Sequence, residues 1–254
     1  MKRPLVIATA NWPRNVLIVC LFVEAWLIFL HFRLTQYENP TVTLLGQAFD
    51  LTRESALPTY WSSLLALGVG ASALAVFLVE KAKGKPSVSK VAWLVAAILF
   101  TCISLDDAMA FHERLGAITS LDLMERLHYR SYPWHITVAP LFALGFLAIA
   151  IPIWRAVKCL PGLTFMLLVG FACYGGAIAL DFVEGIYQMS RAGSTPPAFL
   201  NLPMLMVTEE ALEMAGTTFF LYVFFSYFLH RLDETEVLIQ RDPLSGQVAP
   251  RASQ

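Results

Sequence analysis

Apolar positions along the chain occur in long blocks, separated by shorter polar stretches. Six of these blocks reach the roughly 20 apolar residues that a helix needs to cross a bilayer. They cover residues 15–33, 61–80, 91–112, 134–154, 162–187 and 205–229. The pattern predicts an all-α, polytopic membrane protein with six transmembrane helices. Residues 1–232 would form the transmembrane domain, and residues 233–254 a polar, disordered cytoplasmic tail.

The composition agrees with this class, because 57% of the residues are hydrophobic and 15% are charged. A soluble domain has about 25% charged residues. The formal net charge of −1 provides no basic field for nucleic acid. The first block carries Glu24 and His31, and no small-residue cleavage pattern follows it. We therefore expect a retained span there rather than a signal peptide.

The distribution of Lys and Arg predicts the orientation of the six spans. Twelve of these residues fall in the two terminal segments and in the loops near 81–90 and 155–161, and five fall in the other three loops. The positive-inside rule then puts both termini in the cytoplasm. This bias, with no targeting segment in the sequence, predicts the inner (plasma) membrane of a bacterium and an outer face in the periplasm.

Ionisable residues gather at the predicted outer ends of five of the six spans. The third span ends in "SLDDAMAFHERLG", the fifth ends in "ALDFVEGIYQ", and the sixth begins with "VTEEALEMAG". At 1.5 Å per residue, Asp106 lies roughly 22 Å along its span, inside a hydrocarbon core about 30 Å thick. A charge near the centre of a helix costs at least ~2.5–3.5 kcal/mol, so such residues need partners, water or a function.

Helical spacing indicates which of these side chains share a face. Asp106 and Glu113 are seven residues apart, and Asp181 and Glu184 are three apart, so each pair lies on one side of its predicted helix. Carboxylates with a few imidazoles suit iron, manganese or zinc. The predicted metal ligands are Asp106, Glu113, Asp181, Glu184 and Glu213. The predicted catalytic groups are Glu210 as general base and His112 and His135 as ligands or proton carriers.

These features favour a metal-dependent enzyme embedded in the membrane, with a site that opens to the periplasm. It would be a hydrolase or an oxidoreductase acting on a lipid-like or small apolar substrate, with a divalent metal activating water or oxygen. One alternative is a proton- or cation-coupled transporter that uses the same carboxylates as a relay. Another is a non-catalytic accessory subunit of a membrane complex, in which the acids pair with arginines. The expected partners are membrane lipid and other membrane subunits, and nucleic acid is not among them.

Overall fold

The computed structural model describes residues 11–35, 40–53, 55–83, 88–111, 114, 134–190 and 202–241. All regular secondary structure in these ranges is helical. The helices are α1 (Trp12–Leu34), α2 (Pro40–Ala48), α3 (Leu57–Ala82), α4 (Val88–Met109), α7 (Trp134–Thr137), α8 (Ala139–Val157), α9 (Pro161–Ser190) and α10 (Leu202–Arg241).

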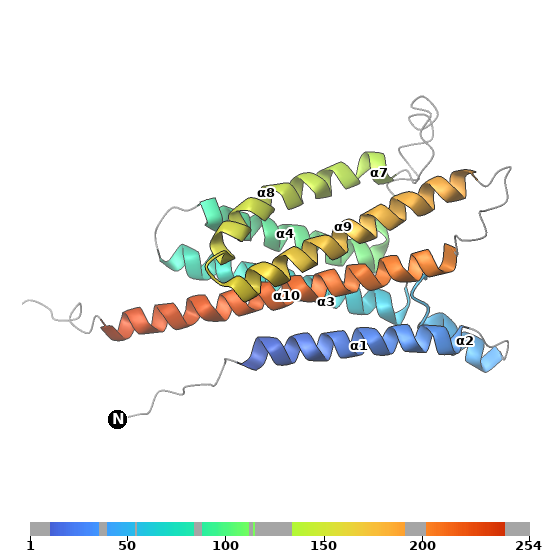
Figure 1. The fold of residues 1–254 in the computed structure, drawn as a ribbon, viewed down its shortest axis with the longest axis horizontal. Helices are drawn as coiled ribbons and strands as arrows, with labels where there is room; N and C mark the ends of the chain where they lie inside the picture. The colour runs from blue at the N-terminus through green and yellow to red at the C-terminus, as the bar shows by residue number, and fades with distance from the viewer. Residues whose placement is uncertain are drawn as a thin grey trace, which may run out of the picture.

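Six helices in the described ranges are long and apolar enough to cross a membrane, and they match the six predicted blocks in order. This confirms the all-helical class and the six helices of membrane-spanning length and apolarity. The start of α1 and the end of α10 lie at the same end of the bundle, which we call the terminal end (Figure 1). At the opposite end, α4 and α9 finish and α10 begins. We call it the site end.

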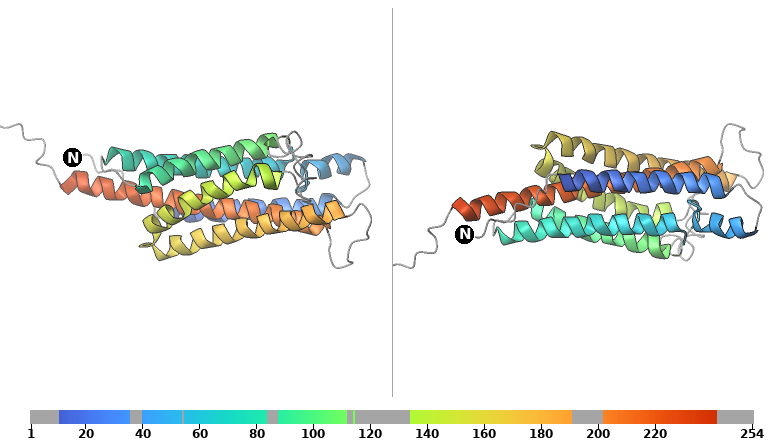
Figure 2. Two further views of the ribbon diagram at one scale, coloured as in Figure 1. Left: turned by 90° about the horizontal axis from the view of Figure 1, so that it is seen from above. Right: turned by 90° about the horizontal axis from the view of Figure 1, so that it is seen from below.

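Five helices form a closed ring in which each packs against its neighbours, in the order α3, α4, α8, α9, α10 and back to α3. Helix α1 lies outside this ring and packs mainly against α10, as the views from above and below show (Figure 2). Large apolar side chains such as Phe22, Leu64 and Leu141 are exposed on the outer surface. Lipid tails are as apolar as these side chains, so this exposure fits a membrane protein.

The interior of the ring is filled by aromatic side chains along much of its length. Phe220 on α10 is buried at the centre, and its ring lies 5.0 Å from that of Phe171 and 5.4 Å from that of Phe100. Toward the terminal end, Trp93 stacks on Tyr227 with 5.1 Å between ring centroids. These rings adopt the tilted, edge-on and stacked arrangements that aromatic pairs prefer. They form a continuous apolar layer between the two ends of the bundle.

Two helix ends differ from the expectation in a way that affects the site. Helix α4 ends at Met109, because Ala110 adopts a left-handed conformation with φ of 49° that terminates the helix. The helical spacing that was expected to align Asp106 with Glu113 therefore ends at Met109, and Glu113 lies outside the described residues. The fourth block is also divided, since α7 ends at Thr137 and α8 starts at Ala139, just before a proline that lacks a backbone N–H.

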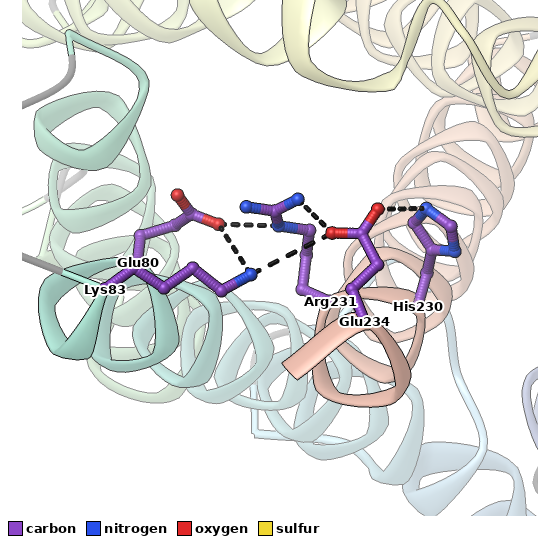
Figure 3. A network of polar contacts seen from close by, with 5 residues as sticks. All are labelled: Glu80, Lys83, His230, Arg231 and Glu234. Carbon is purple, nitrogen blue, oxygen red and sulfur yellow. Dashed lines mark hydrogen bonds and ion pairs between the residues drawn. The ribbon is translucent and has the colours of Figure 1, made fainter. Parts of the chain in front are cut away.

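Helix α10 continues past Leu232 to Arg241, so the first part of the predicted polar tail is helical. An ion-pair network at the terminal end, shown in Figure 3, joins this part of α10 to α3. Arg231 donates through Nε to Glu80 at 2.6 Å and also pairs with Glu234. Lys83 lies 4.0 Å from Glu80 and 3.9 Å from Glu234, so each acid meets two cations.

Candidate functional site

The best-defined polar contact at the site end joins α7 to α9. Nε2 of His135 lies 2.8 Å from Oδ2 of Asp181, and the two side chains are only 7% and 10% exposed. The imidazole also packs against the rings of Trp134 and Phe182, at 4.6 and 5.5 Å between centroids. A buried carboxylate bonded to one ring nitrogen fixes the orientation of the ring. The pair is thus an oriented acid–base couple.

Further carboxyl groups on α9 and α10 lie near this pair. Glu184 lies on α9, three residues after Asp181, and is 3% exposed. Glu209 on α10 is close enough to Asp181, Glu184 and Glu213 for their charges to interact with it. Charged groups of α9 and α10 therefore meet next to the His135–Asp181 pair.

A hydroxyl pair extends the polar region toward the aromatic layer. The hydroxyl of Thr217 donates to the backbone oxygen of Glu213 at 2.8 Å, and the hydroxyl of Tyr174 lies 2.7 Å from Thr217 Oγ1. Because Thr217 has a single hydroxyl proton, which is used for the backbone, Tyr174 is the donor to Thr217. Tyr174 is also within electrostatic range of Glu213 and of Asp107 on α4. Groups from α4, α7, α9 and α10 thus converge at the site end.

Gly216 allows α9 and α10 to approach closely at this level. A Cβ atom added there would lie 2.7 Å from Cδ2 of Tyr174 and 3.2 Å from Cβ of Cys173. The first distance is shorter than real carbon contacts, which are about 3.5–4.0 Å. A side chain at this position would therefore push Tyr174 away from Thr217.

The structure assembles part of the predicted site. Asp181, Glu184, Glu213 and His135 contribute to the cluster described above, while Asp106 and Glu210 are partly buried at the site end. Two residues absent from the prediction also contribute. Glu209 was signalled by its four-residue spacing to Glu213, whereas nothing in the apolar run around Tyr174 indicated a role. The predicted residues His112 and Glu113 lie outside the described residues.

The predicted metal site stays a prediction. Among the residues that the structure describes, no group of three or more His, Cys, Asp and Glu side chains is arranged to hold a metal ion. Zinc sites in proteins use at least three protein ligands. The described cluster by itself therefore lacks the ligand set of a resident zinc ion, and its reactive groups are acids, bases and hydroxyls.

Sequence comparisons assign the chain to a protein family. No curated protein and no solved structure matches the chain. The family described as a domain of unknown function, DUF8692, matches residues 16–228, which cover all six long helices almost completely. The protein therefore belongs to the DUF8692 family.

Proposed function

We propose that the protein is an enzyme of the bacterial inner membrane whose acid–base site lies in the periplasmic half of the bilayer. In this proposal both termini are cytoplasmic, as the distribution of Lys and Arg favours. The site end then faces the periplasm, and the substrate is lipid-like or a small apolar molecule that reaches the site from the membrane. The observation that carries the proposal is the buried contact of 2.8 Å between His135 and Asp181.

The roles follow from the chemistry of the side chains. His135 accepts a proton from the substrate or from water, and Asp181 orients the ring and stabilises the imidazolium that forms. The carboxyl groups of Glu209 and Glu213, whose charges interact, pass protons to and from this pair. Tyr174 provides a hydroxyl donor at the inner side of the cluster, next to the apolar layer.

The arrangement of polar groups favours an enzyme over a transporter. A carrier needs a polar route to both ends of the bundle at some stage of its cycle. Here the aromatic layer around Phe100, Phe220 and Phe224, which are buried in the ring, lies between the acidic cluster and the terminal end. Because this layer offers no polar route to the terminal end, it favours a site that is reached from one side only.

The proposal is tested by incubating purified protein in vesicles made from bacterial lipids and analysing lipids and small molecules by mass spectrometry. The wild type is expected to convert a component, and Asp181→Asn and His135→Gln are expected to stop the conversion. Glu234→Gln, which alters the ion-pair network at the terminal end, is the matched control and should remain active. Conversion that is unchanged in Asp181→Asn, or no conversion by the wild type, would contradict the proposal.

The same preparations test the prediction of iron, manganese or zinc. Elemental analysis of the wild type should find stoichiometric metal if the site is completed by residues such as His112 and Glu113. Asp181→Asn should then reduce the metal content, while Glu234→Gln should leave it unchanged. If the wild type converts substrate without stoichiometric metal, acid–base catalysis remains supported and the predicted metal is not part of it.

A further inference from the structure

Glu24 lies on α1 and faces α10, where Thr218 is its neighbour. It occupies the middle of α1, with 12 residues of the helix before it, and it is 4% exposed. A helix of 23 residues rises roughly 1.5 Å per residue, so its centre lies far from either membrane surface. The carboxyl of Glu24 is thus held deep within the membrane.

The neighbours of Glu24 are polar but not basic. The hydroxyl of Thr218 on α10 donates to Oε1 of Glu24 at 2.5 Å. Trp61 on α3 places its buried indole N–H beside the same carboxyl, and this N–H has no hydrogen-bond partner in the described structure. The other titratable neighbours are Cys20 on α1 and Cys173 on α9.

Within the described ranges, no Lys, Arg or His forms an ion pair with Glu24. An ionised carboxylate at the centre of a membrane helix is costly when no cation pairs with it. Hydrogen bonds from neutral donors do not replace a counter-ion. The neutral form keeps a hydrogen bond with Thr218 and avoids most of this cost.

We infer that Glu24 is a second proton-binding site, in the middle of the membrane and separate from the His135–Asp181 pair. Its ligand is a proton, and the bound form is the neutral carboxylic acid bonded to Thr218. Exchange of this proton requires contact with water. The inference rests on the surroundings of Glu24 alone and does not depend on the proposed enzymatic activity.

Infrared spectroscopy of the protein in lipid tests this directly, because a neutral carboxyl has a C=O stretching band separate from that of a carboxylate. We expect a band near neutral pH that shifts when the sample is moved from H2O to D2O and that is lost in Glu24→Gln. Thr218→Val removes the hydrogen bond and should move this band to higher frequency without abolishing it. This second variant keeps the test valid if Glu24→Gln is poorly folded.

The controls distinguish Glu24 from the acids of the cluster at the site end. Glu209→Gln and Glu213→Gln should leave the band assigned to Glu24 unchanged. If Glu24→Gln leaves the C=O band of neutral carboxyls unchanged and instead removes a carboxylate band, Glu24 is ionised and the inference is overturned. A Glu24 band that is insensitive to D2O would also overturn it, because the proton would then not exchange.

Discussion

Replacing Gly216 with alanine tests the close approach of α9 and α10 that places Tyr174 against Thr217. The new methyl group would lie 2.7 Å from Tyr174 Cδ2, about 1 Å closer than carbon atoms pack. Tyr174 is itself surrounded by the rings of Phe146 and Phe220, at 5.5 and 5.6 Å between centroids, so it has little room to yield. Overpacking of this kind costs about 1–3 kcal/mol.

Gly175 on α9 is the matched control, because a Cβ atom there would meet nothing within 4 Å. Replacing either glycine by alanine also raises helix propensity by about 0.8–1.0 kcal/mol. That gain is shared by both variants, so the difference between them isolates the steric effect. We expect Gly216→Ala to be less stable than Gly175→Ala by about 1–3 kcal/mol.

The assay is SDS-induced unfolding in mixed micelles, followed by far-UV circular dichroism and tryptophan fluorescence. Gly175→Ala should unfold at the same SDS fraction as the wild type or at a higher one, and Gly216→Ala at a lower one. Equal midpoints for the two variants would refute the argument, since they would show that α9 and α10 do not approach closely at Gly216.

Three further predictions address the aromatic layer, the terminal-end network and the orientation. Phe220→Ala empties a buried position in the ring and should lower the free energy of unfolding by about 3–5 kcal/mol. Phe22 is 69% exposed, so Phe22→Ala should change that free energy by less than about 0.5 kcal/mol. Equal losses in the two variants would contradict the described core. Arg231→Gln should destabilise the protein because it leaves Glu80 with Lys83 alone, while His230→Gln should cost at most about 1 kcal/mol because its pair with Glu234 is exposed. Reporters placed after residue 254 and near Lys83 should both report cytoplasm, and a periplasmic signal from either would reverse the proposed orientation.

The six long helices were predictable because length and apolarity are local properties of the sequence. Each apolar block carries its own signal, and each block matches a helix that is long enough to span a membrane. The end of α4 was not predictable in the same way. Ala110 is a good helix former, yet it has a φ of 49°, a conformation that residues with a side chain seldom adopt. The apolar pattern therefore extended the third span too far.

The site was predictable only along individual helices. Three- and four-residue spacings place Glu184 with Asp181 and Glu209 with Glu213, because a helix has 3.6 residues per turn. Contacts between helices depend on how each helix rotates and packs, and no spacing encodes this. The pair formed by His135 and Asp181 is separated by 46 residues in the sequence. The role of Tyr174 likewise depends on the absence of a side chain at Gly216, on another helix.

The central claim, that His135 and Asp181 form a working acid–base pair at the site end, is tested most directly by nuclear magnetic resonance. The protein would be labelled with ¹⁵N-histidine and placed in lipid nanodiscs, and the His135 signals assigned by their loss in His135→Gln. The claim predicts ring resonances that change with the pH of the buffer and that shift in Asp181→Asn but not in Glu234→Gln. Resonances of His135 that are identical in the wild type and Asp181→Asn, or that do not respond to pH, would contradict it.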